Sequence, residues 1–275
     1  MSVCINGEFF NANDAKISVF DHGLLYGDGV FDTIAAVNGQ IWWLDEHLNR
    51  LLEGCNSIFL EHPWSKSELT ELTHETFRLT GGDRGRIRIT ITRGIGEIPS
   101  YCLDSCQPNL IIFVTPLDFP QESTYSKGIS LKSINHHRVL PQVKNLSFLP
   151  SIIGYENSQR DGFDDAVFVD DFGYVREGTS WNIFLATEQR LITPKDSILV
   201  GVTRNKVIEL AENLGFSIEI KSVKLEDLYS ANEIFVTGTT KRIIGVNRID
   251  NFVISNGIIG EYTRTLLGKF QTIFY

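Results

Sequence analysis

The sequence predicts a two-domain protein that combines helices and strands, of the α+β or α/β class. Segments with helical periodicity and segments rich in β-branched residues both occur along the whole chain, and a polar stretch with two prolines interrupts them near the middle. A length of 275 residues fits one large domain or two of modest size. We therefore expect a small N-terminal α/β domain at 1–116, a linker at 117–127 and a large C-terminal α/β domain at 128–275.

The composition excludes several classes of protein. A hydrophobic share of 42% and a charged share of 21% are typical of a chain with a sizeable core. A net charge of −9 argues against a nucleic-acid partner, because such a surface needs a basic face. No apolar run reaches the length of a membrane span, and the N-terminus lacks the pattern of a signal peptide. We expect a cytoplasmic protein with no membrane partner.

The cysteines and histidines do not indicate a metal site. The four cysteines are Cys4, Cys55, Cys102 and Cys106. The last two form a C-x3-C spacing, which fits neither the redox motif nor the common zinc motifs, so reduced structural thiols are expected. The pair His136–His137 has no cysteine or carboxylate at ligand spacing. We expect no bound metal.

The N-terminal part indicates hairpins, two helices and two further strands. Asn6–Gly7 and Asn38–Gly39 are hairpin turn signals. Leu44 begins a helical pattern, and Ser65 with Glu68 forms a capping box for a second helix ending near Gly81. The apolar stripe of the first helix consists of Leu48, Leu51, Leu52, Cys55, Ile58 and Phe59. Strands are expected at 86–93 and 110–115. A Gly-x-Gly occurs at 27–29, but strand-like residues follow it, which does not fit a dinucleotide-binding loop.

The C-terminal part alternates between strands and helices. The strands are expected at 129–134, 165–169, 181–186, 216–220 and 232–237, and the helices after Lys144 and at 203–214, 224–229 and 261–273. This alternation indicates a second α/β domain.

An ordered set of motifs carries a family resemblance. The motifs are FDHGLLYGDGVF at 20–31, VKNLSFL around Lys144, EGTSWN from Glu177, GVTRNKVIELAENLG at 201–215 and FVTGTTKRI at 235–243. In this order and spacing they resemble the class IV aminotransferases, the pyridoxal-phosphate enzymes of fold type IV. That family includes branched-chain and D-amino acid aminotransferases and 4-amino-4-deoxychorismate lyases. The resemblance implies a D-amino acid aminotransferase-like fold with the cofactor between two domains, and a homodimer.

The resemblance implies a role for two residues at the ring of pyridoxal 5′-phosphate. Lys144 matches the lysine that forms the Schiff base, and such a lysine must be partly neutral to attack an aldehyde. Glu177 matches the glutamate that faces the pyridine nitrogen and keeps it protonated. Without the resemblance, Lys144 would be interpreted as a solvated charge before a helix and Glu177 as an exposed loop carboxylate.

Four residues match the family's phosphate-binding positions. Thr203 sits where an N-cap is expected, and a glycine-led turn into a helix presents free N–H groups to an anion. By resemblance, the backbone of Val202 and the hydroxyls of Thr203 and Thr239 hold the phosphate. Arg50 matches an arginine that binds the same group, although the helical wheel alone predicts that it faces solvent.

The candidates for substrate binding are Phe31, Arg88 and Arg93. Phe31 matches an aromatic wall beside the cofactor. Arg88 and Arg93 are five residues apart in a predicted strand, so they point to opposite faces and cannot serve one pocket in the same way. Structural ion pairing is an equally good interpretation of either arginine.

The sequence departs from the subtypes of the family. Phe148 stands where branched-chain enzymes have tyrosine, and D-T-I-A at 32–35 replaces their E-G-I-R. The Arg-x-His pair of the D-amino acid enzymes is absent after the T-R-G at 92–94. The F-x-T that ends at Thr33 resembles the lyases, but their following arginine is also absent. The identity and handedness of the amino acid stay open.

The motifs are compatible with three functions. The preferred one is a pyridoxal-phosphate-dependent aminotransferase that moves an amino group between a small amino acid, of the branched-chain or D-amino acid type, and a 2-oxo acid through Lys144. The first alternative is a 4-amino-4-deoxychorismate lyase, which releases pyruvate and forms 4-aminobenzoate. A remote alternative is a non-catalytic binding protein of the same fold, but the presence of both Lys144 and Glu177 argues against it.

Overall fold

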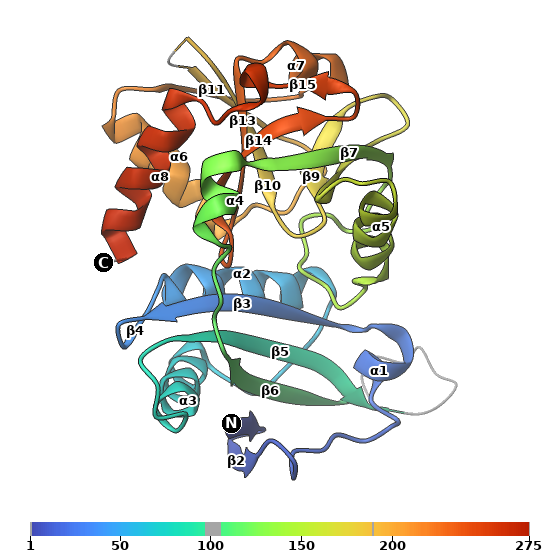
Figure 1. Cartoon of the computed structure of the whole chain (residues 1–275). Coiled ribbons are helices and arrows are strands. Elements are labelled where there is room, and N and C mark those ends of the chain that lie inside the picture. Colours follow the sequence, from blue (N-terminus) through green and yellow to red (C-terminus); the bar gives the residue numbers. More distant parts are fainter. Residues whose placement is uncertain (1, 97–105, 189, 275) are drawn as a thin grey trace. The chain divides into compact units, whose positions relative to one another are not determined.

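The computed structural model describes residues 2–96, 106–188 and 190–274, and it consists of two compact units (Figure 1). The first unit comprises Met1–Asp118 together with Val143–Ser147, and the second comprises Phe119–Gln142 and Phe148–Tyr275. The segment with Lys144 therefore packs with the N-terminal unit, so that neither unit is one continuous stretch of the sequence. The expected linker at 117–127 contains a helix, α4 (Glu122–Lys127).

The first unit is an antiparallel sheet with helices. Its elements are β1 (Ser2–Ile5), β2 (Glu8–Asn11), α1 (His22–Tyr26), β3 (Gly29–Val37), β4 (Gln40–Ile41), α2 (Leu44–Ser57), α3 (Lys66–Arg78), β5 (Gly85–Ile95) and β6 (Gln107–Thr115). The strands form a six-stranded sheet in the order β2-β1-β6-β5-β3-β4, in which every pair is antiparallel. The two predicted hairpins are confirmed as β1–β2 and β3–β4.

The core of the first unit lies between its sheet and helices α2 and α3. Leu48 and Leu51 of α2 are buried with Leu69 of α3 against the isoleucines of β5. The capping box of α3 is confirmed, because Ser65 and Glu68 bond to each other's backbone N–H groups. Phe59 was predicted to extend the buried stripe of α2, but the helix ends at Ser57 and Phe59 is exposed with φ 54°.

The second unit contains a mixed sheet. Its elements after α4 are β7 (Ile129–Asn135), α5 (Leu149–Arg160), β8 (Asp165–Val169), β9 (Val175–Gly178), β10 (Asn182–Thr187), β11 (Arg190–Pro194), α6 (Val202–Asn213), β12 (Ser217–Lys221), α7 (Leu225–Ser230), β13 (Glu233–Gly238), β14 (Arg242–Ile249), β15 (Phe252–Val253), a 3₁₀ turn η1 (Ser255–Gly257) and α8 (Glu261–Phe274). Figure 1 shows α6 and α8 side by side, in orange and red.

The order of the strands explains which segments meet. The nine-stranded sheet has the order β12-β11-β10-β13-β14-β7-β8-β9, with β15 paired to β14. The pairs β11–β12, β14–β7 and β7–β8 are parallel, and the others are antiparallel. Each predicted element of this part exists within a few residues, whereas β9, β11, β14, β15 and η1 were not predicted.

Two further observations bear on the sequence-based expectations. No helix in the described part of the chain is long and apolar enough to cross a membrane. Cys4, Cys55 and Cys106 are free thiols, and Cys102 lies outside the described residues.

Candidate active site

Lys144 is fixed beside the first residues of β3. The backbone N–H of Phe31 donates to the carbonyl of Lys144 at 2.9 Å, and the N–H of Leu146 donates to the carbonyl of Gly29 at 3.1 Å. Only glycine fits at position 29, because a Cβ there would lie 2.6 Å from the Ile91 carbonyl oxygen and 2.8 Å from Leu146 Cδ1. The segment with Lys144 thus pairs with β3 through an isolated antiparallel bridge between Val30 and Asn145.

The ring of Phe31 has two cations close to it. Lys144 Nζ lies 4.7 Å from the ring centroid, and Arg88 Cζ lies 3.7 Å from it. Arg88 Nε donates to Thr90 Oγ1 at 3.3 Å, and burial lowers the pKa of the Arg88 guanidinium. Within the described residues no carboxylate bonds to Arg88. Three of the predicted site residues, Phe31, Arg88 and Lys144, therefore meet.

Arg93 lies on the other face of β5, and its guanidinium donates hydrogen bonds to groups within the first unit. Its Nε and Nη2 donate to the Asp28 carboxylate at 2.6 and 3.1 Å, and Nη1 and Nη2 donate to the carbonyls of Phe59 and Ile58 at 2.9 and 2.8 Å. Arg93 is buried. Of the two interpretations left open for Arg93, these contacts favour the structural one.

The helical wheel alone predicts that Arg50 faces solvent, but in the structure its side chain is largely covered. Its Nε and Nη2 donate to the two oxygens of Asp32 at 2.9 and 2.7 Å, and 14% of its side chain is exposed. His47, one turn earlier in α2, contacts the same carboxylate through Nδ1 at 2.8 Å. Because a carboxylate only accepts, His47 Nδ1 carries the proton, and Nε2 is buried with no partner in the described residues.

The protonation states of Asp32 and His47 reflect both their burial and the charges beside them. Burial alone would raise the pKa of Asp32, but attraction to Arg50 and His47 outweighs it and holds that pKa far below its usual range. Burial lowers the pKa of His47, Asp32 opposes this, and the cations Arg50 and Lys144 reinforce it. At neutral pH the group is therefore an ionised Asp32, a cationic Arg50 and a neutral His47.

Glu177 of β9 is buried and bound through both oxygens. Arg138 donates Nη1 to its Oε1, and the backbone N–H of Leu199 donates to Oε2 at 3.1 Å. Only 3% of Glu177 is exposed, so the interpretation as an exposed loop carboxylate is wrong. A buried carboxylate with a cationic donor is suited to a protonated ring nitrogen.

The N-terminus of α6 is formed differently from the prediction. Gly201, and not Thr203, is the N-cap, and the helix begins at Val202. Thr203 is therefore in the first turn, where N–H groups have no partner inside the helix, and no acidic side chain occupies that turn. A Cβ at Gly201 would lie 2.1 Å from Asn182 Oδ1, and Asn182 Nδ2 donates to the Leu199 carbonyl at 2.8 Å. Asn182 thus fixes the loop that leads into the helix.

Thr239 lies in the turn between β13 and β14, and its side chain is half-buried. The turn is closed by the N–H of Lys241, which donates to the Gly238 carbonyl at 3.0 Å. Glu177, Val202, Thr203 and Thr239 all belong to the second unit, whereas Phe31, Arg50, Arg88, Arg93 and Lys144 belong to the first.

Three residues of these groups, Asp32, His47 and Arg138, were not identified from the sequence. Asp32 is an acidic residue inside an otherwise apolar strand, and His47 and Arg50 are three apart in a helix and so share a face. Those two signals were available. The contact of Arg138 with Glu177 spans 39 residues and has no local signal.

Comparison with known proteins decides the family. The model of the family described as amino-transferase class IV matches residues 29–249. The chain belongs to this family. It is an enzyme of fold type IV, as the sequence motifs predicted.

Relatives of two subtypes cover the chain almost completely. A protein of Methanocaldococcus jannaschii assigned as a branched-chain-amino-acid aminotransferase is 37% identical over 99% of this chain and 96% of its own length. The D-alanine aminotransferase of Bacillus licheniformis is 29% identical over 98% of this chain and 96% of its own.

Solved structures of class IV enzymes have the same fold. The branched-chain aminotransferase of Thermoproteus uzoniensis with norvaline has a TM-score of 0.92 and 30% identity over 100% of this chain and 94% of that one. A branched-chain amino acid aminotransferase with pyridoxamine 5′-phosphate has a TM-score of 0.95 and 26% identity, covering 99% of this chain and 93% of that one. The 4-amino-4-deoxychorismate lyase of Pseudomonas aeruginosa has a TM-score of 0.86 and 27% identity, covering 99% and 100%.

Proposed function

We propose that this class IV enzyme is a pyridoxal-phosphate-dependent aminotransferase that acts on a small amino acid and a 2-oxo acid. The observation that carries the proposal is the pair of chemical groups that such an enzyme needs. A lysine is fixed beside an aromatic ring, and a buried carboxylate accepts hydrogen bonds from an arginine and a backbone N–H. The identity of 37% to an assigned branched-chain-amino-acid aminotransferase favours a branched-chain amino acid as the substrate.

The residues present fit pyridoxal phosphate. Glu177 has the burial and the charge to bind a protonated pyridine nitrogen. The first turn of α6 offers the N–H groups of Val202 and Thr203 with no competing acid, and Thr239 adds a hydroxyl. Arg50 adds a cation to the phosphate, and Asp32 orients its guanidinium through two hydrogen bonds. Lys144 provides the amine that attaches to the aldehyde.

The mechanism assigns one task to each of these groups. When bound, the cofactor supplies an electron-withdrawing ring conjugated to the substrate nitrogen. Lys144 Nζ would serve as the base that accepts the proton from the substrate Cα and as the acid that gives it back. Glu177 would hold a proton on the ring nitrogen of the cofactor, which is the charge state in which the ring withdraws electrons most strongly. The backbone of Val202 and the hydroxyls of Thr203 and Thr239 would bind the phosphate and so orient the cofactor.

Arg88 is the better candidate for the substrate carboxylate. It stacks on Phe31 within reach of the same ring as Lys144, it is desolvated, and it has no ion pair in the described part of the chain. Arg93 donates to one carboxylate and two carbonyls on the opposite face. We therefore assign Arg88 to the substrate, Phe31 to the wall beside it, and Arg93 to the fold.

A homodimer is the expected assembly. Five apolar side chains in and beside α1 are exposed in one short segment, namely Val19, Phe20, Leu24, Leu25 and Tyr26. Contiguous exposed apolar surface is typical of an interface between subunits. Light scattering of the active enzyme is expected to give twice the mass of 31.0 kDa, and an active monomer would contradict the assignment.

The 4-amino-4-deoxychorismate lyase activity is the second candidate, because the lyase of Pseudomonas aeruginosa has the same fold and covers the whole chain. The two activities share the proton removal by Lys144 and differ in the step after it. The lyase releases pyruvate, whereas the aminotransferase leaves the amino group on the cofactor.

Two assays on one preparation separate the candidates. In the first, the enzyme is mixed with single amino acids of each hand, and conversion of its visible absorbance band to the pyridoxamine form is followed. In the second, aminodeoxychorismate is supplied and pyruvate is measured. We expect conversion with at least one amino acid and recovery of the band with 2-oxoglutarate or pyruvate. Rapid pyruvate release with no conversion by any amino acid would establish the lyase instead.

A further inference from the structure

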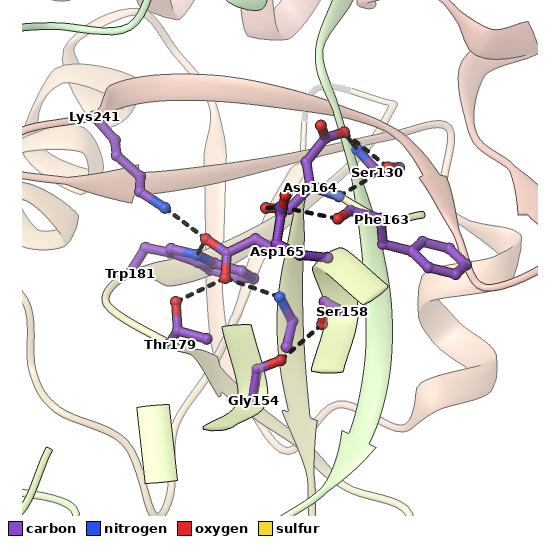
Figure 2. Close-up of polar contacts among 11 residues, drawn as sticks. Ser130, Gly154, Ser158, Phe163, Asp164, Asp165, Thr179, Trp181 and Lys241 are labelled. Atoms are coloured by element: carbon purple, nitrogen blue, oxygen red, sulfur yellow. Dashed lines mark hydrogen bonds and ion pairs between the residues drawn. The ribbon is translucent and has the colours of Figure 1, made fainter. Parts of the chain in front are cut away.

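Asp165, the first residue of β8, is a buried carboxylate outside the groups assigned above. Its Oδ1 accepts from the Ala166 N–H at 2.8 Å and from Thr179 Oγ1 at 2.7 Å. Its Oδ2 accepts from Trp181 Nε1 at 2.8 Å and from Lys241 Nζ at 2.6 Å. Figure 2 shows these side chains converging on Asp165 from separate elements. Only 2% of Asp165 is exposed, so the carboxylate is satisfied by the protein itself.

Each side-chain donor lies close in sequence to a residue of the proposed cofactor site. Thr179 and Trp181 follow Glu177 in the connection between β9 and β10. Trp181 also covers position 178, because a Cβ at Gly178 would lie 2.1 Å from atoms of its indole ring. Lys241 is two residues after Thr239, in the turn between β13 and β14. Asp165 therefore links the segment that holds Glu177 to the segment that holds Thr239.

The turn between β13 and β14 is held on several sides. Tyr125 Oη donates to the Lys241 carbonyl at 3.2 Å, and the Lys241 N–H closes the turn on Gly238. The next residue, Arg242, is buried with φ 59°, in the left-handed region that non-glycine residues rarely adopt, and its guanidinium lies 3.6 Å from the Phe119 ring centroid. The left-handed conformation of Arg242, directly after the turn, persists because the surrounding side chains are anchored.

We propose that Asp165 and Lys241 form a positioning pair that fixes the 238–241 turn, so that Thr239 is held in place to bind the phosphate of the cofactor. The inference rests on the proposed function, since it deepens the role given to Thr239. A lysine so near a phosphate site would ordinarily be assigned to the phosphate itself. Here the Lys241 ammonium is bound to a buried carboxylate, so it acts on the phosphate through the position of the turn.

The test measures cofactor affinity of the apoprotein, with no reliance on activity. Pyridoxal phosphate and pyridoxal are each titrated into wild type and into Asp165→Asn, Lys241→Met and the double variant, and binding is followed by absorbance. Loss of the charge-assisted contact is expected to weaken pyridoxal phosphate by about tenfold or more in each single variant. Pyridoxal, which has no phosphate, is expected to bind all four proteins alike. Lys221→Met, which removes an exposed ion pair with Glu219 in the same unit, is the matched control and should bind like wild type.

Asp165→Asn separates the proposal from direct phosphate binding by Lys241. If Lys241 were itself a phosphate ligand, releasing it from Asp165 would leave affinity unchanged or raise it, and the proposal would be overturned. An equal loss of pyridoxal affinity would overturn it too, because it would mean general disruption of the site.

The double variant removes any effect of leaving one charge buried and unpaired. Its thermal unfolding is expected to return toward wild type while its affinity for pyridoxal phosphate stays low. Recovery of wild-type affinity in the double variant would contradict the positioning role. Failure of the wild type to bind pyridoxal phosphate at all would refute the proposed function instead.

Discussion

The first unit and the second unit treat their buried charges differently. In the second unit Glu177 is bound through both oxygens before any ligand arrives, by Arg138 and the Leu199 N–H. In the first unit Arg50 and Arg93 are paired with carboxylates, whereas Arg88 lies on Phe31 with no acidic partner in the described residues. A ligand of constant structure, such as a cofactor, suits a preformed carboxylate, and a variable substrate suits a cation that lacks a partner. Under the proposed function, Glu177 then belongs to the cofactor half of the site and Arg88 to the substrate half.

The largest effect is expected at Lys144, which both halves need. Lys144→Ala removes the amine that attaches the cofactor and moves the proton, so turnover should fall by at least about a thousandfold. Single-turnover absorbance with the preferred amino acid measures this loss. Lys206→Ala, which removes a half-buried lysine of α6 that contacts Glu209, is the control and should keep wild-type turnover.

The second largest effect is expected at the preformed carboxylate. Glu177→Gln keeps the shape of the side chain but loses the charge that holds the proton on the ring nitrogen. Proton removal should slow by about a hundredfold while the cofactor still binds. The kinetic isotope effect with amino acid deuterated at Cα should rise, because proton removal becomes more limiting. Unchanged turnover would show that this carboxylate does not act on the ring.

The two arginines of β5 provide a direct test of the division between site and fold. Arg88→Met is expected to raise KM for the amino acid by roughly ten- to hundredfold, since it removes a charged contact to the substrate carboxylate, with little change in the melting temperature. Arg93→Met is expected to do the opposite. It leaves Asp28 and two carbonyls without their donor and should lower the free energy of unfolding by about 3 kcal/mol. A rise in KM for Arg93→Met with normal stability would reverse the assignment.

Features that depend on local sequence patterns were predictable, whereas features that depend on distant residues were not. Helix α3 was predictable with its capping box, because capping is a local hydrogen-bond pattern. The N-cap of α6 was misplaced by two residues, because the choice of Gly201 depends on Asn182, a distant residue that packs against it. The helical wheel by itself indicated an exposed Arg50, because a wheel does not register that Asp32 of a neighbouring strand accepts hydrogen bonds from its guanidinium. Long-range polar partners were the common cause of these errors.

The smallest effect is expected from pH, at the paired charges of the first unit. Burial depresses the pKa of His47, so the folded state prefers neutral His47. The stability contributed by this preference is present above the unfolded pKa of about 6.5 and is lost as the pH falls below it, at most about 1.4 kcal/mol per pH unit. Asp32 also has a depressed pKa, but its contribution is lost only at pH values below the usual range of a carboxyl group.

Melting temperatures between pH 7.5 and 5.5 check this expectation. His62 and His136 also have pKa values lowered by burial, so wild type must be compared with His47→Gln, which keeps a donor for Asp32. The variant is expected to lose less stability than wild type over this interval. Equal losses would mean that burial does not lower the pKa of His47 below its value in the unfolded chain.

The central claim is that Lys144 carries the cofactor, and chemical trapping tests it most directly. The enzyme purified with pyridoxal phosphate is reduced with borohydride, digested and analysed by mass spectrometry. The account predicts a phosphopyridoxyl label on Lys144, and no label there in Lys144→Ala. A label on Lys127, Lys195 or Lys206 in the wild type would contradict it.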